Sequence, residues 1–328
     1  MRLLHDLLGS AGSRSVAEPA PWPSFVADDH TPVEFSLSFL RSERPELRFL
    51  VERLAPDVNA GRATRWFTEQ LAHRYGLALD RFDAVAGLFL PAQPRGRFSL
   101  WHAVVLRADG RHHFKVYFDP TARGEDRAPA LVAAALERLG LGAAGRTVVA
   151  PAFGPGPRPD RFMFFSLDLH AGPLSRTKVY VAHHGAGPAD VERTTRAVPA
   201  AVPGAAAEFC RLVGGGQGRF DARPLLSCYS FLGDDGDSPS GYTLYLPIRD
   251  YAPDDKVARD RVATLLERNG ADPMVLDRAL NSVAHRPLAA GVGLISYVSL
   301  RMGLRPAVTV YLSSEAYRTS AEPAGARP

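Results

Sequence analysis

Two lysines of this 328-residue chain stand in matching Lys-Val-Tyr tripeptides, at residues 115–117 and 178–180. Lysine is rare here, because only three of the 39 lysines and arginines are lysines. Each tripeptide lies in an apolar, β-branched run that is typical of a strand. Side chains two residues apart share one face of a strand, so each lysine would lie beside a tyrosine. The pattern indicates a site where a compact positive charge binds an anionic ligand.

A third cation extends one of these faces. Arg176, Lys178 and Tyr180 are spaced at i, i+2 and i+4, so all three side chains would lie on one side of the strand. Several preorganised cations in a low-dielectric site stabilise an anion as it forms, and arginine can bind two oxygens at once. Such a face would suit a ligand that carries negative charge.

Tyrosines recur at the same register of four strand-like segments. The face of a phenol ring carries negative quadrupole density and attracts cations. A set of four such rings on adjacent hairpins could surround a cation, whereas any one of them alone would be an ordinary core residue. The four are Tyr117, Tyr180, Tyr245 and Tyr311.

Two further side chains are candidates for proton and hydrogen-bond chemistry. Glu34 shares the polar face of its segment with Ser36 and Ser38, where a carboxylate could accept a hydrogen bond from a ligand. His102 lies in another strand-like segment, where a neutral imidazole could act as a proton acceptor. We therefore expect both side chains to act in catalysis.

The elements that must position these residues form a repeat of about 60 residues, with five strand pairs separated by helical segments. Gly or Pro at the joins predicts antiparallel hairpins. The predicted strand pairs are 32–39 with 46–52, 100–107 with 112–118, 162–169 with 177–183, 225–232 with 242–248, and 292–300 with 307–313. The predicted helices are 62–75, 128–139, 205–213, 255–268 and 273–284, with Asp254 and Asp272 as N-caps.

Each predicted strand has one aliphatic face and one face of cations, hydroxyls and phenols. The helices must bury their apolar stripes on the aliphatic faces, so the polar faces must point away from the helices. Ten antiparallel strands can satisfy this by closing into a barrel with a polar, solvent-filled lumen and helices outside. The alternative is an open sheet with one solvated face.

Bulk composition limits the function classes. The net charge is +4 and no basic run reaches five residues, which argues against nucleic-acid binding. Two cysteines cannot build a disulfide framework, and no run approaches 18 apolar residues. We expect a cytoplasmic protein that does not bind membranes, with one domain over residues 1–328, a core at about 28–317 and flexible terminal tails.

Five short motifs in order resemble the dimethylallyltryptophan synthase family of aromatic prenyltransferases, in particular its bacterial members. The resemblance covers about residues 28–317 and implies the ABBA fold, also called the PT barrel, which is an α+β architecture. It also implies transfer of a prenyl group to an indole in secondary metabolism. The motifs are Thr31-Pro-Val-Glu34-Phe-Ser36, Lys115-Val-Tyr117, Arg176-Thr-Lys178-Val-Tyr180, Leu244-Tyr245 and Val310-Tyr311.

The resemblance assigns roles by motif. Glu34 would accept the indole N–H, and His102 falls about where some members place a lysine base. Thr243 stands where some members carry a longer polar side chain, and it is expected to contact the lumen, as is Tyr297. The diphosphate would be held by Arg48, Lys115, Arg176, Lys178 and Arg301, and the cation by Tyr117, Tyr180, Tyr245 and Tyr311.

No metal is expected to be essential. The common alternative is Mg²⁺ held by an Asp-rich helix, but the acidic pairs here do not form an Asp-Asp-x-x-Asp helix motif; they are Asp28-Asp29, Asp234-Asp235 with Asp237, and Asp254-Asp255. The expected cosubstrate is dimethylallyl or geranyl diphosphate. The other partner would be a small aromatic acceptor, and the protein would be a monomer or weak homodimer.

Two alternatives stay open from sequence. The same fold could prenylate a phenol or another aromatic, or the barrel could bind an isoprenoid without turning it over. The sequence leaves open whether the acceptor is tryptophan, a cyclic dipeptide or another indole. It also leaves open the ring position that is attacked.

Overall fold

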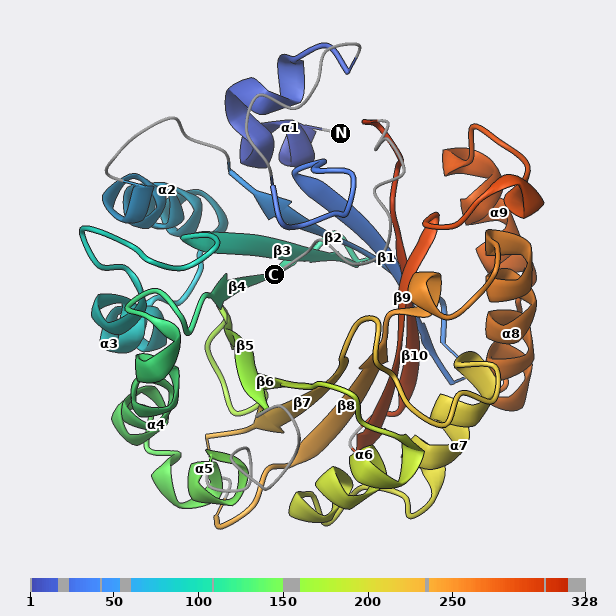
Figure 1. Ribbon diagram of the computed structural model, residues 1–328. Coiled ribbons are helices and arrows are strands. Elements are labelled where there is room, and N and C mark those ends of the chain that lie inside the picture. The colour runs from blue at the N-terminus through green and yellow to red at the C-terminus, as the bar shows by residue number, and fades with distance from the viewer. Residues whose placement is uncertain are drawn as a thin grey trace.

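The computed structural model describes residues 2–16, 24–41, 43–53, 60–107, 109–149, 160–233, 236–303 and 305–317. Ten antiparallel strands close into a barrel in the order β1-β10-β9-β8-β7-β6-β5-β4-β3-β2. Figure 1 looks into the ring of strands, with the helices from α2 to α9 around its outside. The predicted closed barrel is confirmed, and the open sheet is wrong.

Each predicted hairpin is present, so sequence neighbours pair all around the ring and β1 closes it against β10. The strands are β1 Val33–Leu40, β2 Glu46–Glu52, β3 Leu100–Leu106, β4 His113–Phe118, β5 Arg161–Asp168, β6 Thr177–His183, β7 Leu225–Phe231, β8 Gly241–Leu246, β9 Ile295–Gly303 and β10 Ala307–Leu312.

The five predicted helices are also present, and others accompany them. One of the additional helices, α3, could have been predicted, because its apolar residues have helical spacing. These residues are Phe82, Val85, Ala86 and Phe89, and all four are fully buried. The helices are α1 Arg2–Leu8, α2 Ala60–Tyr75, α3 Asp80–Phe89, α4 Ala128–Arg138, α5 Gly142–Val149, α6 Pro188–Thr194, α7 Ala205–Val213, α8 Asp255–Arg268 and α9 Met274–Val283. Short 3-10 turns lie at Gly9–Ser13, Glu125–Arg127, Thr195–Ala197, Ile248–Asp250 and Leu288–Ala290.

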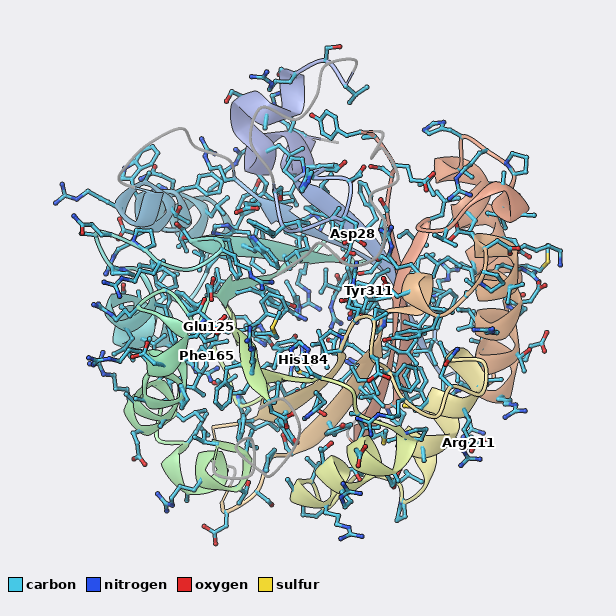
Figure 2. The ribbon with its side chains drawn as sticks, viewed as in Figure 1. Asp28, Glu125, Phe165, His184, Arg211 and Tyr311 are labelled. Carbon is cyan, nitrogen blue, oxygen red and sulfur yellow. The ribbon has the colours of Figure 1, made fainter. Side chains whose placement is uncertain are left out.

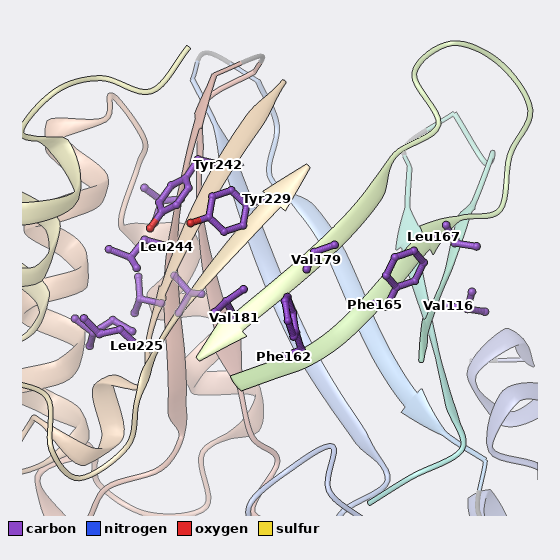
Figure 3. Close-up of a cluster of buried hydrophobic side chains, with 14 of the residues drawn as sticks. Val116, Phe162, Phe165, Leu167, Val179, Val181, Leu225, Tyr229, Tyr242 and Leu244 are labelled. Carbon is purple, nitrogen blue, oxygen red and sulfur yellow. The ribbon is translucent and has the colours of Figure 1, made fainter. Parts of the chain in front are cut away.

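The hydrophobic core lies between the outer faces of the strands and the helices. Phe118 of β4 and Phe165 of β5 are fully buried and stack on Phe89 of α3, with ring centroids 5.2 and 5.1 Å apart. Each such side chain stabilises the fold by roughly 1.5–3 kcal/mol through burial. Figure 3 shows the same outward faces further round the barrel, including Val179, Val181 and Leu244. The apolar side chains on the outer faces of the strands therefore pack against the helices, and the inner faces are left for polar groups.

A buried carboxylate fixes the start of β9. Asp255, in the first turn of α8, accepts backbone N–H bonds of 3.1–3.2 Å from Gly293, Leu294 and Ile295. Arg286 donates to the same carboxylate at 2.6 Å and neutralises it. Asp254 caps α8, as predicted, by accepting the N–H of Val257 at 2.8 Å. These bonds set the position at which β9 enters the barrel.

The chain before residue 28 also joins the fold. Helix α1 buries Leu7, which belongs to the main hydrophobic core. Within the residues described, we find no helix with the length and apolar character that a membrane crossing requires.

Candidate active site

The inward faces of the strands carry the residues that the sequence singled out. Tyr117, Tyr245 and Tyr311 keep partial exposure although they point into a closed barrel, whereas their outward-facing neighbours are buried. Solvent therefore reaches the inside, which we call the lumen. In Figure 2, Tyr311 lies toward the inside of the ring, whereas Arg211 lies on the outer helical rim.

One end of the lumen gathers the cations predicted to hold a diphosphate. Lys115 and Lys178 are 5% and 7% exposed, on β4 and β6. Strand register places Arg48 opposite Ser36, and Arg301 opposite Thr243. Arg176 precedes β6, and its charge acts on both lysines and on Arg301. Each of the five predicted cations thus lies within electrostatic range of at least two others: Arg48, Lys115, Arg176, Lys178 and Arg301.

Burial and mutual repulsion weaken the hold of these cations on their protons. Burial and, after it, the neighbouring charge of Arg176 together lower the pKa of Lys178 to about 8. Burial also holds the pKa of Lys115 well below its ordinary value. The pKa of Arg301 falls to about 10 through burial and the nearby Arg48 and Arg176. A bound polyanion would reverse these shifts, because it favours the charged form of each group.

A buried carboxylate that sequence analysis missed lies among these cations. Asp168 of β5 pairs with Nε of Arg176 at 2.8 Å and with Nζ of Lys115 at 3.8 Å. Burial would raise its pKa, but the charges of Arg176, Lys115 and Lys178 hold that pKa far below the usual value. The sequence contained a signal for Asp168. It has the same strand parity as Ser166, which pairs with Lys178, so its side chain was expected on the inner face.

The four predicted tyrosines form a continuous arc across alternate strands. Ring centroids lie 5.9 Å apart for Tyr117 and Tyr180, 5.7 Å for Tyr180 and Tyr245, and 5.8 Å for Tyr245 and Tyr311. Burial raises the pKa of each phenol, so the rings stay neutral. Thr243 lies on the same inner surface, paired with Cys228 and Arg301, as predicted for a lumen contact.

Glu34 lies in the lumen beyond this arc, beside Tyr311. Ser296 Oγ donates to Glu34 Oε1 at 2.9 Å and also lies 3.3 Å from the carbonyl oxygen of Tyr311. Burial raises the pKa of Glu34 to about 8, the hydrogen bond from Ser296 opposes the rise, and the charge of Asp28 adds to it. In the empty protein at pH 7, Glu34 is therefore mostly protonated.

An ion network adjoins Glu34, and sequence analysis missed it. Arg223 pairs with Asp28 at 3.1 Å and with Asp250 at 3.2 Å, and Arg249 also pairs with Asp28. The guanidinium of Arg223 lies 5.8 Å from the ring centroid of Tyr297. Tyr297 is therefore a lumen contact, as predicted, but it belongs to the end near Glu34 and not to the cationic end near Arg301. No periodic signal marks Asp28 or Arg223, because both lie in loops.

A patch of aromatic side chains also faces inward. Phe98 stacks on Trp101 with centroids 4.0 Å apart, and Phe164 lies 5.3 Å from Trp101. Val26, Leu50 and Tyr117 pack against this group. Trp101 could have been found from sequence, because it has the opposite parity to the core residues of β3. The patch gives the lumen an apolar wall suited to an aromatic ring and a prenyl chain.

The prediction that His102 is a lumen base is wrong. Its side chain is on the outer face of β3 and packs against α2, with the ring of Phe67 at 5.3 Å. Thr68 Oγ1 donates to the carbonyl of Thr64, so the 3.0 Å contact between His102 Nε2 and Thr68 Oγ1 has the imidazole as donor. Burial lowers the pKa of His102 to about 3. His102 has the parity of Leu100 and Val104, which are core residues, and this signal was misjudged.

No group of three or more His, Cys, Asp or Glu side chains suited to a metal occurs among the described residues. Asp28 is engaged with Arg223 and Arg249, and Asp254 and Asp255 hold the start of α8 and the entry of β9. Asp234 and Asp235 lie outside the described residues.

Comparison with known proteins agrees with this geometry. Residues 3–197 match the family model described as tryptophan dimethylallyltransferase. A crystal structure of 6-dimethylallyltryptophan synthase from Micromonospora olivasterospora, in complex with DMASPP and Trp, is 49% identical. The match covers 98% of this chain and 92% of that one, with a TM-score of 0.92.

Two further solved structures extend the comparison. The 5-dimethylallyltryptophan synthase of Streptomyces coelicolor, also in complex with DMASPP and Trp, is 38% identical with a TM-score of 0.88. That match covers 99% of this chain and 91% of that one. AnaPT from Neosartorya fischeri is 19% identical, with a TM-score of 0.73 over 94% of this chain and 84% of that one, and it shares the fold.

Proposed function

Because the chain belongs to the tryptophan dimethylallyltransferase family and is therefore an aromatic prenyltransferase acting on indoles, we propose that it transfers a dimethylallyl group from dimethylallyl diphosphate to the indole ring of L-tryptophan. The reaction is a Friedel–Crafts alkylation that requires no metal. The observation that carries this proposal is the order of the lumen, with cations at one end, an arc of phenols in the middle and Glu34 beyond it.

The cationic end supports ionisation of the donor. As the allylic C–O bond breaks, its electron pair stays with the diphosphate, and the negative charge on the leaving oxygen grows. Lys115, Lys178 and Arg176 are fixed in a mostly buried site, so they stabilise that charge with little reorganisation. These residues supply the charge compensation that Mg²⁺ provides in enzymes with an Asp-rich site, with Arg48 and Arg301 as further diphosphate contacts.

The phenol arc supports the survival of the cation. Tyr117, Tyr180, Tyr245 and Tyr311 present neutral aromatic rings in contact distance of one another across four strands. Ring faces attract a carbocation, and a continuous wall keeps water from adding to it. The dimethylallyl cation would lie along this arc until the acceptor carbon attacks it, and the ring would then lose the proton from that carbon to the departed diphosphate or to water.

The far end supports an indole acceptor. Glu34 in its ionised form would accept a hydrogen bond from the indole N–H, which orients the ring and raises its electron density. Binding of that N–H favours the ionised carboxylate and so opposes the raised pKa of Glu34. The apolar wall of Phe98, Trp101 and Phe164 offers a surface on which a planar ring can pack.

The ion network next to Glu34 supports a free amino acid as the acceptor. Arg223 and Arg249 offer positive charge, and Asp28 and Asp250 offer negative charge, within one cluster at this end. A zwitterion presents a carboxylate and an ammonium together, so it can pair with both signs. A cyclic dipeptide has neither charge, so it would not pair with either sign in this cluster.

One incubation distinguishes the candidate functions. The protein is mixed with dimethylallyl diphosphate and, in parallel, with L-tryptophan, L-tyrosine or cyclo-Trp-Trp, and products are read by mass spectrometry. We expect a dimethylallyl adduct that is largest with L-tryptophan. A larger adduct with L-tyrosine would favour phenol prenylation, and donor binding without any adduct would favour a non-catalytic barrel.

A further inference from the structure

A carboxylate inside an anion-binding site needs an explanation, and Asp168 is such a group. Its side chain is 2% exposed, and it accepts from Nε of Arg176 at 2.8 Å and from the backbone N–H of Arg176 at 3.2 Å. Nζ of Lys115 lies 3.8 Å away. A bound diphosphate would be repelled by this charge, so any benefit of Asp168 must come from its effect on the cations.

The benefit is electrostatic. Burial and mutual repulsion both drive Lys115 and Lys178 toward the neutral amine, which cannot stabilise a leaving anion. The charge of Asp168 opposes this by raising the pKa of both lysines. Its own pKa is far below the usual value, so it stays ionised wherever the lysines titrate.

Asp168 also sets the orientation of Arg176. The carboxylate takes Nε of the guanidinium, and in the described part of the chain the two terminal nitrogens make no hydrogen bond. Those two nitrogens are the pair that binds two oxygens of a phosphate group at once. Arg176 is therefore held through Nε, which leaves its two terminal nitrogens for a ligand.

We propose that Asp168 is a positioning residue for the prenyl diphosphate. It shifts Lys115 and Lys178 toward their charged forms and holds Arg176 in place, so the diphosphate meets a preformed set of charges. Asp168 itself does not contact the substrate. The proposal rests on the proposed function of this end of the lumen as the diphosphate site.

The charged and titratable groups around Asp168 come from several elements, and each contributes to the local field. Around Asp168 and the two lysines they are Lys115, His113 and Tyr117 of β4, Arg176 before β6 and Lys178 of β6, His170 after β5, Arg81 of α3, Glu46 and Arg48 of β2, Arg301 of β9 and Cys228 of β7. Glu46 is tied to Arg48 at 2.6 Å, so Asp168 is the carboxylate paired directly with Lys115 and Arg176.

A positioning role for Asp168 can be distinguished from a purely structural one, because the hairpin of β5 and β6 also has hydrogen bonds that do not involve the Asp168 carboxylate. The N–H of Asp168 donates to the carbonyl of Arg176 at 3.0 Å, and Ser175 Oγ donates to the carbonyl of Asp168 at 3.1 Å. These bonds are kept in Asp168→Asn, which has nearly the same shape. We therefore expect the variant to fold.

The test measures inorganic pyrophosphate binding to the full chain by calorimetry between pH 6.5 and 8.5. Without the carboxylate the lysines lose protons at lower pH, but repulsion of the anion is also removed. Asp168→Asn should bind within about threefold of wild type at pH 6.5 and about tenfold more weakly at pH 8.5. Proton uptake on binding, measured in buffers of different ionisation enthalpy, should be larger in the variant at pH 8.5.

The controls separate this inference from its premise. Asp260→Asn removes an exposed carboxylate paired with Lys256 and should match wild type at both pH values. If Asp168→Asn does not fold, Asp168→Glu is measured instead, and it should keep the wild-type pH dependence with weaker binding. An affinity loss that is the same at every pH, or no loss, overturns the positioning role. A failure of the proposed function appears separately, as pyrophosphate binding without prenyl transfer.

Discussion

Ser296 occupies a bulge in β9 and donates a 2.9 Å hydrogen bond to Glu34 on β1. Tyr311 pairs with Tyr297 and Leu312 with Ile295, so Ser296 is the extra residue in the strand. A bulge re-aims a side chain that regular alternation would place elsewhere. Glu34 and Ser296 are 262 residues apart in sequence, and their contact exists because β10 lies between β1 and β9 in the closed barrel.

Replacing Glu34 tests the anchor for the indole. Glu34→Gln should keep the fold and lower turnover with tryptophan by about 30- to 1000-fold, since a charge-assisted contact in a desolvated site is worth roughly 2–4 kcal/mol. Steady-state kinetics measure the loss. Glu208→Gln, which changes an exposed carboxylate on α7, should leave the rate unaltered. A Glu34→Gln enzyme with the wild-type rate would end the argument for this anchor.

The same carboxylate predicts the pH dependence of acceptor use. The ionised form of Glu34 is needed and its pKa is about 8, so kcat/KM for tryptophan should rise with pH through that value at saturating donor. Ser296→Ala removes a hydrogen bond that lowers this pKa, so the rise should move to higher pH. A rate profile that is identical in Ser296→Ala and wild type would show that the contact does not tune Glu34.

Replacing Lys178 tests the proposed diphosphate site. Lys178→Ala should raise the KM of the donor and lower kcat, because the diphosphate carries more charge in the transition state than in the ground state. Lys178→Arg should restore activity only in part, since a planar fork needs more room beside Arg176. Lys256→Ala is the matched control, because Lys256 is exposed on α8 and pairs with Asp260. Equal kinetics for Lys178→Ala and Lys256→Ala would make the Lys-Val-Tyr motifs structural.

The corrected place of His102 predicts a stability effect in place of a catalytic one. His102→Ala should lower the unfolding free energy by about 1–3 kcal/mol, because it removes a buried ring and its bond to Thr68, while kcat of the folded protein changes little. The pKa of His102 is about 3 in the fold and higher when unfolded, so its contribution is lost as pH falls below about 6.5 and is complete above it. Acid denaturation curves of both proteins measure this, and a large fall in kcat would return His102 to catalysis.

Strand periodicity was enough to predict the barrel and most of its inner surface. Lys115, Tyr117, Lys178 and Tyr180 lie where a period of two places them, because a closed barrel gives each strand one inner and one outer face. The prediction for His102 was wrong because this residue has the strand parity of Val104, which faces outward, and not that of Trp101, which faces inward.

The groups missed from sequence depend on tertiary pairing. The partnership of Asp168 with Lys115 requires the register of β4 against β5, which periodicity does not give. Ser296 faces Glu34 because of a bulge, and Arg223 meets Asp28 from a loop 195 residues away. The inward parity of Asp168 was readable from the sequence, but the partners of these groups were not, because such contacts are set by the way distant segments pack.

The central claim is that lumen cations, and not a metal, stabilise the departing diphosphate. It is tested most directly by mixing the protein with dimethylallyl diphosphate and L-tryptophan in excess EDTA and following the prenylated product by mass spectrometry. Turnover in EDTA should be within about twofold of turnover with Mg²⁺, because Lys115, Arg176 and Lys178 already supply the charge. Loss of product in EDTA, with recovery when Mg²⁺ is added in excess, would contradict the account.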